Sequence, residues 1–256
     1  MSSASSPHHR IPFHFHAEGH GFSGEFRHPG RRLIHAQAAT SLPTIGGHAR
    51  AHADHFHFED FVSFRTAFTE VSGRKVNKNT FKTHATAVIE DLNILDVVTA
   101  DRIVARLTST HDPNDLEHPE GLIVADGSEF HNLRIHGHEV RVILRHEILR
   151  GFREFSNLGE LIAKDKKEGR ITGQNARVVI CSLVNRLESD LDYIKEHPHR
   201  HVIEVPDFGK ISIAEVFAEP GTRTLTMLHL QLGSPHVADL TAAETRTNGQ
   251  PPPPKG

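Results

Sequence analysis

Apolar and polar residues alternate with a period of two along much of this chain. At 13–16 two phenylalanines alternate with two histidines, and at 48–54 three alanines alternate with two histidines, an arginine and an aspartate. Successive side chains of a β-strand point to opposite faces, so a strand with one buried face produces this pattern. The sequence therefore predicts strands that bury phenylalanine or alanine on one face and present histidine to water on the other.

Further segments of this character are spread over the rest of the chain. Predicted strands lie at 80–90, 101–109, 121–125, 177–184, 210–217 and 224–232, and a predicted hairpin with Gly137 in its turn lies at 132–144. In contrast, the apolar residues between 148 and 162 follow helical spacing, and Gly169 is placed to end a helix. We expect a mainly-β fold, an antiparallel sandwich or roll with a helical insertion at about 147–175.

Both ends of the chain differ in composition from the segment between them. Residues 1–10 are rich in serine, and 248–256 are polar and then proline-rich, so we expect disordered tails around a single domain at 11–247. The N-terminal stretch has no apolar core of signal-peptide length, and no later segment reaches about 18 uninterrupted apolar residues. We therefore expect a soluble, cytoplasmic protein without a membrane span.

Charge and histidine content bound the function. Acidic and basic residues nearly balance, 32 against 29 for a net charge of −3, so no whole-chain field favours nucleic acid as a partner. The chain has 23 histidines, a residue type whose charge changes between about pH 5 and pH 7, which predicts a pH-responsive protein. Its one cysteine, Cys181, lies in an apolar run, where we expect a buried and unreactive thiol.

The segment AHADHFHFED at 51–60 concentrates candidate metal ligands. His52, Asp54 and His55 match three positions of the His-x-His-x-Asp-His signature of metallo-β-lactamase-type hydrolases, but Arg50 occupies the position of the first ligand. The apolar phase also changes here, because the alanines before Asp54 are odd-numbered and the phenylalanines after it are even-numbered. A strand with a bulge near Asp54 and His55 explains this change and favours a structural interpretation over a di-metal site.

Histidine pairs two residues apart offer a second kind of metal site. Side chains at i and i+2 of a strand share a face, so both imidazoles of a pair can reach one divalent ion such as zinc, iron or manganese. Such pairs are His14 with His16, His55 with His57, and His136 with His138. The alternative is that phenylalanine packs inward and histidine faces water. A further cluster, His197, His199 and His201, is expected in a surface turn.

Signatures of other enzyme classes are not completed. HEVRV and HEILR lack the second histidine of a zincin, and GFSG is not a Gly-x-Ser-x-Gly nucleophile elbow. No phosphate-binding loop and no glycine-rich dinucleotide turn occurs in the sequence. No cofactor other than a divalent metal is therefore indicated.

Several segments resemble proteins of a known kind. TFKTHATAVIEDLNILDVVTADRIVARLTS, GSEFHNLRIHGHEV and VPDFGKISIAEVF followed by LTMLHLQLGSP are similar, in the same order, to the core of bacterial choice-of-anchor P family surface proteins. SLPTIGGHA and LNILDVVTADRIVARLTS look still closer to a group of uncharacterised bacterial cytosolic-type β-rich proteins. The resemblance covers about 40–145 and 200–245, with the helical region as an insertion, and it rests on turn and core residues. It implies an all-β, non-enzymatic exported protein, although this sequence shows no signal peptide.

The residues and the resemblance favour a non-catalytic structural or interaction protein that associates with itself or with another protein. The alternative is a metal-binding protein or a metal-dependent enzyme, either a hydrolase or a cupin-type oxygenase, that uses the strand histidine pairs.

Overall fold

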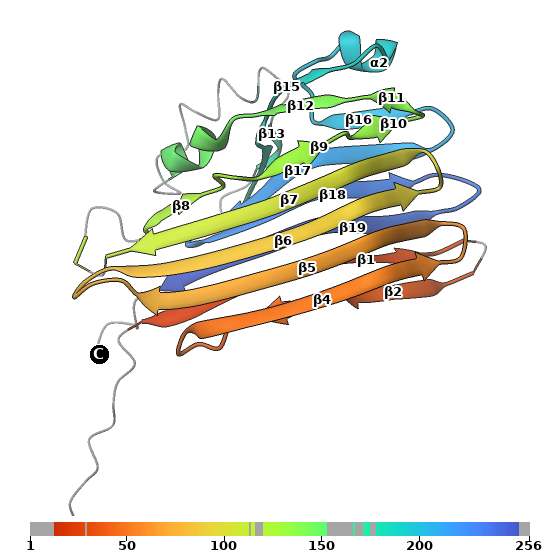
Figure 1. Cartoon of the computed structure of the whole chain (residues 1–256). Helices are drawn as coiled ribbons and strands as arrows, with labels where there is room; N and C mark the ends of the chain where they lie inside the picture. The colour runs from red at the N-terminus through yellow and green to blue at the C-terminus, as the bar shows by residue number, and fades with distance from the viewer. Residues whose placement is uncertain are drawn as a thin grey trace, which may run out of the picture.

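The chain folds into two antiparallel β-sheets that pack face to face (Figure 1). A computed structural model describes residues 13–28, 30–112, 114–115, 120–152, 166, 171–174 and 178–250. The mainly-β antiparallel sandwich predicted from the alternating residues is confirmed. Within the described residues, no helix has the length and apolar character needed to cross a membrane.

Sheet A, behind sheet B in Figure 1, joins the two ends of the chain. Its strands are β1 (His14–Phe26), β2 (Arg32–Gln37), β3 (Thr40–Ser41), β13 (Ile171–Gln174), β14 (Val179–Ser182), β16 (Val202–Val205), β17 (Gly209–Glu219), β18 (Thr222–Leu232) and β19 (Ala238–Gln250). The order across the sheet is β13-β14-β17-β18-β19-β1-β2, with β16 paired to β17 and β3 paired to β1. The first long strand therefore pairs with the last, and the sheet requires both ends of the described chain.

Sheet B is formed by consecutive strands of the N-terminal half. Its strands are β4 (Gly47–Phe58), β5 (Val62–Lys75), β6 (Phe81–Ile94), β7 (Val98–His111), β8 (Leu122–Val124), β9 (Glu129–His131), β10 (Arg134–Ile135) and β11 (His138–Glu139). The order is β11-β10-β7-β6-β5-β4, and both β8 and β9 pair with β7. A separate two-stranded sheet is made by β12 (Arg141–Leu144) and β15 (Val184–Glu188). Strand β4 is thus an edge strand of sheet B.

The expected helical insertion at about 147–175 is described at its two ends and at residue 166, and the expectation is wrong for 171–174, which form a strand. A 3-10 helix, η1 (His146–Phe152), begins it, and by Ile171 the chain has returned to sheet A as β13. Residues 153–165 and 167–170 lie outside the described residues, as do 1–12 and 251–256. A short helix, α2 (Asp192–Lys195), follows β15. Strand β19 continues to residue 250, beyond the expected start of the C-terminal tail at 248.

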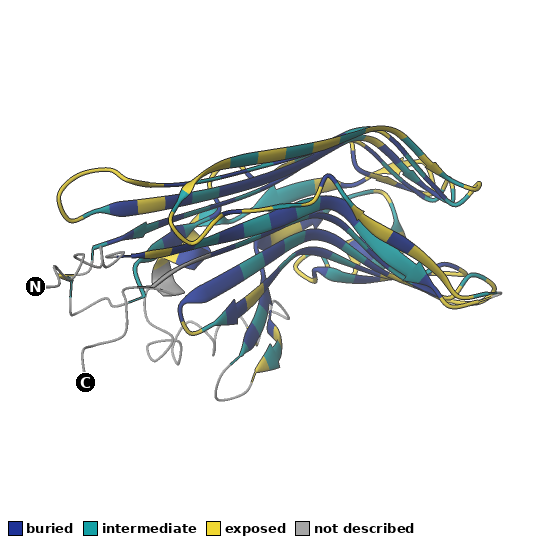
Figure 2. Ribbon diagram, turned by 90° about the horizontal axis from the view of Figure 1, so that it is seen from below, coloured by how far each residue is buried: buried dark blue, intermediate teal, exposed yellow. Residues whose placement is uncertain are grey.

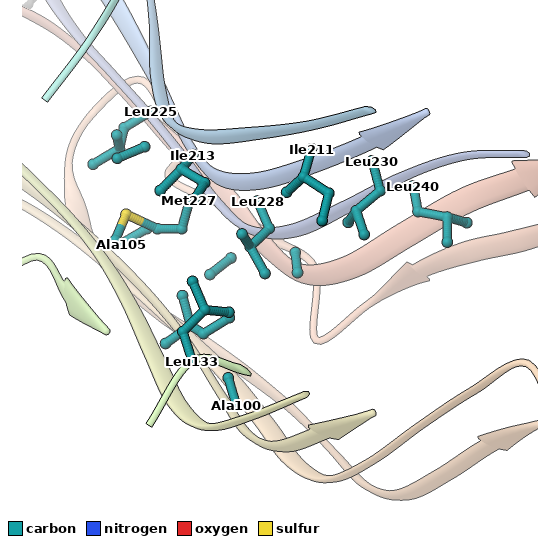
Figure 3. Close-up of a cluster of buried hydrophobic side chains, with 14 of the residues drawn as sticks. Ala100, Ala105, Leu133, Ile211, Ile213, Leu225, Met227, Leu228, Leu230 and Leu240 are labelled. Carbon is teal, nitrogen blue, oxygen red and sulfur yellow. The ribbon is translucent and has the colours of Figure 1, made fainter. Parts of the chain in front are cut away.

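Aliphatic side chains of the two layers meet in the core. The labelled side chains in Figure 3 are Ile211, Ile213, Leu225, Met227, Leu228, Leu230 and Leu240 from sheet A, opposite Ala100, Ala105 and Leu133. Burying one such leucine or isoleucine contributes about 1.5–3 kcal/mol relative to leaving it exposed. Cys181 is fully buried in the same core, as its apolar neighbours in sequence predict.

Strand β1 approaches sheet B closely because it carries glycines. A Cβ atom added to Gly21 would lie 2.5 Å from the Cβ atom of Ala67, and one added to Gly19 would lie 3.1 Å from Cγ2 of Thr69. Rings fill the wider space along the strand. The aromatic pairs are Phe13 with Phe81, Phe22 with Phe64, Phe26 with Phe58, and Phe56 with Phe64. The spacing of the two sheets is therefore set by glycine and alanine at some positions and by phenylalanine at others.

Residues with a left-handed backbone conformation form a line across sheet B. His55, Asp91 and Asn132 have φ angles of 52°, 53° and 49°. In the strand registers of sheet B, Arg65 of β5 and Asp101 of β7 lie between them.

A left-handed residue reverses the face to which the following side chains point, so the better-buried residues of β4 change from odd to even numbers at His55. The predicted phase change is therefore present, but the register of β4 with β5 is unchanged across it. The feature is therefore not a bulge in one strand. It is a bend that crosses the strands of sheet B along the line of His55, Asp91 and Asn132, and we call it a crease.

Sheet A has a matching crease. Ala214 and Ala243 have φ angles of 49° and 52°, and the ladder places Gly21 and Met227 beside Ala243 on the neighbouring strands. Figure 2 shows both layers bending in the same direction, so the two sheets stay nested. The outer face of sheet A lies on the inside of this bend and is concave.

Candidate functional site

Polar side chains line the concave outer face of sheet A along its crease. They lie on β1, β19, β18 and β17, near the residues with left-handed backbone conformation, and one further member, His201, directly precedes β16. On a regular strand, side chains three residues apart point to opposite faces, but the crease turns His20 and Ser23 of β1 toward each other. We call this group the seam, and its members are His20, Ser23, His201, Glu215, Thr226, His229, Asp239, Thr241 and Glu244.

One half of the seam is a chain of hydroxyl, imidazole and carboxylate groups. Ser23 Oγ lies 2.9 Å from His20 Nε2 and 2.8 Å from Thr241 Oγ1, which is 3.1 Å from the same nitrogen. On the other side of the ring, His20 Nδ1 lies 3.9 Å from Glu244 Oε1, and Thr226 donates to Glu244 Oε2 at 2.7 Å. The carboxylate favours the tautomer with the proton on Nδ1, which leaves Nε2 to accept a hydrogen bond from a hydroxyl.

The environment of His20 favours the neutral form of its imidazole. Burial lowers the pKa of His20 below its usual 6.5, and the opposing attraction of Glu244 and Glu18 is smaller. A neutral imidazole that contacts a hydroxyl at one nitrogen and faces a carboxylate at the other can take a proton from that hydroxyl.

The other half of the seam is built around Glu215, which lies between two histidines. Glu215 Oε1 is 3.8 Å from His229 Nδ1, and Glu215 Oε2 is 3.9 Å from His201 Nε2. The second nitrogen of His229 is 3.0 Å from Asp239 Oδ1, so this imidazole bridges two carboxylates. His201 is fully buried, and neither of its ring nitrogens has a hydrogen-bond partner among the described residues.

The pKa values of these two histidines shift in opposite directions. Contact with Glu215, helped by Asp239, raises the pKa of His229 above 6.5 in spite of its burial. Burial lowers the pKa of His201 to about 4, because the attraction of the same glutamate is too weak to compensate. As the pH falls, this half of the seam therefore gains a proton on His229 first and on His201 only near pH 4.

Two pockets open beside the β1 end of the seam. One, of about 330 Å³, is bordered by His20, Glu244 and residues 39–41. The other, of about 410 Å³, is bordered by Ser23 and by residues 33–36 of β2. The contact between His20 and Ser23 therefore lies between two spaces that a small molecule can enter.

The metal candidates of segment 51–60 lie on edge strand β4 rather than at the seam. His52 Nε2 is 3.7 Å from Asp54 Oδ2, and Thr66 donates to Asp54 Oδ1 at 3.1 Å. His55 occupies the left-handed position of the crease, and His57 follows it. All four candidate side chains are exposed, and the fold brings only His52 and Asp54 toward each other.

The other predicted histidine pairs are dispersed. His14 and His16 lie at the start of β1, where His16 Nε2 is 3.8 Å from a carboxylate oxygen of the same strand. His136 is a left-handed turn residue, and His138 Nδ1 is 2.9 Å from Asp190 Oδ1. In the part of the chain that the structure describes, no three His, Cys, Asp or Glu side chains are grouped so that they could hold a metal ion.

Sequence reasoning did not identify the histidines that the fold gathers. His201, expected in a surface turn, is fully buried, because its carbonyl accepts a hydrogen bond from Ile213 N and docks this residue against β17. His20 and His229 belong to no tight motif, and only the pairing of β1, β19 and β18 brings their strands together. The sequence does indicate that His229 is unusual, because it interrupts an apolar run that is otherwise suited to a fully buried strand.

A family model described as a domain of unknown function, DUF8256, matches residues 13–167. The match includes all of sheet B and the first strands of sheet A, whereas β17, β18 and β19 follow it. These later strands complete the sandwich and carry most of the seam, so the folded unit is larger than the matched segment. No curated protein and no solved structure matches the chain.

Proposed function

The chain belongs to the DUF8256 family, and we propose that it is a non-catalytic structural or interaction protein whose concave face on sheet A associates in a pH-dependent manner. The observation that carries this proposal is the placement of His229 between Glu215 and Asp239 on that face. A half-buried imidazole between two carboxylates gives the surface a charge that responds to pH near neutrality.

The charge of the seam follows from its contacts. Glu215, Asp239 and Glu244 contact imidazole and hydroxyl groups within the seam. When His229 is neutral, its imidazole does not compensate the charges of Glu215 and Asp239 on either side of it, and this part of the seam is negative. Because the pKa of His229 is raised, a fall in pH adds a positive charge to the face before unperturbed histidines are fully protonated.

This change in charge predicts the direction of the response. Two negative concave faces repel each other, and the repulsion decreases as His229 and then other histidines gain protons. We therefore propose that association between copies increases as the pH falls from about 8 to the isoelectric point of the sequence, about 6.8. The many histidines elsewhere in the chain also reduce the negative charge down to that pH and make the chain cationic below it, so the test must separate the effect of the seam from theirs.

Sedimentation velocity of the full chain at pH 5, 6, 7 and 8 tests this function. The wild-type protein should shift to larger species as the pH falls from 8 to 7, and the His229→Gln variant should show a smaller shift with a lower midpoint pH. His52→Gln is the matched control, because it removes one exposed histidine of β4 and leaves the seam unchanged. A distribution that does not change with pH, or a His229→Gln profile equal to that of the control, would contradict the proposal.

A further inference from the structure

Ser23 has the contacts that activate a hydroxyl group, although its sequence context does not predict them. In the GFSG segment the second glycine follows the serine directly, whereas one residue separates them in a nucleophile elbow, and Ser23 lies within a strand. The crease nevertheless places Ser23 Oγ 2.9 Å from Nε2 of His20, a residue of the same strand. In enzymes with an activated nucleophile, the nucleophile contacts a base, and a third group orients the base. This arrangement is identified from its geometry and not from the positions of the three residues in the sequence.

The groups behind Ser23 are arranged in a consistent order. Glu244 faces Nδ1 of His20 at 3.9 Å and favours a proton on that nitrogen, so that Nε2 is free to accept. Thr226 fixes Glu244 in turn, since its hydroxyl donates to Oε2 at 2.7 Å. Thr241 Oγ1 lies 2.8 Å from Ser23 Oγ and can donate to it while Ser23 donates to the imidazole.

We propose that Ser23 is an activated nucleophile that accepts an acyl group from an activated ester or thioester. Ser23 Oγ forms a bond to the acyl carbon, and the bond from that carbon to the leaving oxygen or sulfur breaks. His20 Nε2 takes the proton of Ser23 and passes it to the leaving group, which departs as an alcohol or a thiol. The products are an acyl ester on Ser23 and a neutral His20, so atoms and charge balance. The pocket of about 410 Å³ beside Ser23 has room for a small acyl group.

The surroundings of Ser23 favour a single acylation over rapid turnover. The ladder pairs Ser23 with Thr241 on β19 and Gly24 with Ile34 on β2, and the register with β2 shifts between Phe22 and Gly24. Ser23 therefore lies on a paired strand and not on the strand-to-helix turn that supplies backbone donors to the oxyanion, each of which accelerates acyl transfer about 10²–10³-fold. Hydrolysis of the acyl ester should be slow, and the inference is independent of the pH-dependent association proposed above.

Labelling of the full chain with a fluorophosphonate probe and with p-nitrophenyl acetate tests this inference. Wild-type protein at pH 7.5 should acquire about one adduct per chain, located on Ser23 by peptide mass spectrometry. Ser23→Ala should lose the adduct, and His20→Gln should slow its formation by about 100-fold or more, as expected for removal of a general base. An adduct on another residue, no adduct, or an unchanged rate in His20→Gln would overturn the proposal.

Two further variants separate activation from simple exposure. Ser212 lies on the same outer face and opposite His229 in the ladder, so Ser212→Ala removes a comparable serine and should leave labelling unchanged. Thr241→Val should retain the adduct on Ser23, whereas transfer of the label to Thr241 in the wild-type protein would show that the wrong hydroxyl was assigned. Thermal melting of each variant checks that it is folded.

A thiol at this position provides a second measurement that does not depend on oxygen nucleophilicity. The only native cysteine, Cys181, is fully buried, so Ser23→Cys introduces one accessible thiol. Next to the imidazole, this thiol should react with iodoacetamide at least 10-fold faster in Ser23→Cys than in Ser23→Cys combined with His20→Gln. Equal rates in the two proteins would show that His20 does not activate position 23.

Discussion

The seam of sheet A and the edge strand β4 of sheet B are both rich in histidine, but they place it in different environments. On β4, the side chain of His52 is 74% exposed and that of His48 is 46% exposed. In the seam, the corresponding values are 24% for His229, 17% for His20 and 0% for His201. The pKa of each of the three seam histidines is shifted from its usual value. Burial and neighbouring carboxylates, and not the density of histidine in the sequence, therefore select the imidazoles with altered chemistry.

The position of each strand in its sheet explains this difference. Strand β4 pairs only with β5, so its outward side chains have water on one flank. Strands β18 and β19 have a neighbour on both sides, and the crease folds adjacent rows of side chains together on the concave face. Substitutions matched between the two regions should therefore differ in stability, in pH dependence and in metal content.

The largest contrast is expected for removal of an apolar side chain. Leu230 of β18 is fully buried, as its apolar segment predicts, so Leu230→Ala should lower the free energy of unfolding by about 2–5 kcal/mol. Phe58 of β4 is only partly buried and stacks on Phe26, so Phe58→Ala should lower it by about 1.5–3 kcal/mol, because an open edge leaves no closed cavity. Urea denaturation of both variants measures the two values. An unchanged midpoint for Leu230→Ala would show that β18 is not a central strand.

His201 should make the stability of the protein depend on pH. Its folded-state pKa of about 4 is below the unfolded value of 6.5, so the unfolded chain binds the proton more tightly. Stability should therefore fall as the pH drops from about 6.5 to about 4, by roughly 3 kcal/mol from this residue alone. His201→Leu should remove that part of the dependence, whereas His52→Leu on β4 should keep it. Urea melts at pH 4.5, 5.5 and 6.5 measure the slope, and identical slopes in all three proteins would contradict the buried position of His201.

The strands were predictable from the sequence, whereas the seam was not. Alternation and apolar runs placed strands at 210–217 and 224–232, and these segments lie within β17 and β18. The change of phase beside His55 was visible as well, because it depends on neighbouring residues of one strand. The contact of His20 with Thr241 joins residues 221 positions apart, and it requires the pairing of β1 with β19 and the crease together. Neighbouring residues in the sequence do not indicate that β1 pairs with β19 or that sheet A bends at this place.

The close approach of β1 to sheet B should be sensitive to a single methyl group. A Cβ atom at Gly21 would lie 2.5 Å from that of Ala67, so Gly21→Ala must push the two sheets apart at the crease. We expect a loss of about 1–3 kcal/mol, typical of overpacking. Gly30→Ala is the control, because a Cβ atom there meets nothing within 4 Å, and it should change stability by less than about 0.5 kcal/mol. Equal melting temperatures for the two variants would show that the crease can open without cost.

The smallest effect is expected for the histidines of β4 that resemble metal ligands. His52 and His55 are exposed, and His52 Nε2 is 3.7 Å from Oδ2 of Asp54. A His52→Ala, His55→Ala double variant should therefore lose less than about 1 kcal/mol of stability, since it leaves no cavity and no unpaired buried group. Its metal content should equal that of the wild-type protein when both are purified untagged, without chelator or added metal, and analysed by inductively coupled plasma mass spectrometry. A stoichiometric metal that is present in the wild-type protein and absent from the double variant would reverse the roles of the two regions, because β4 would then be the functional site and the seam a structural one.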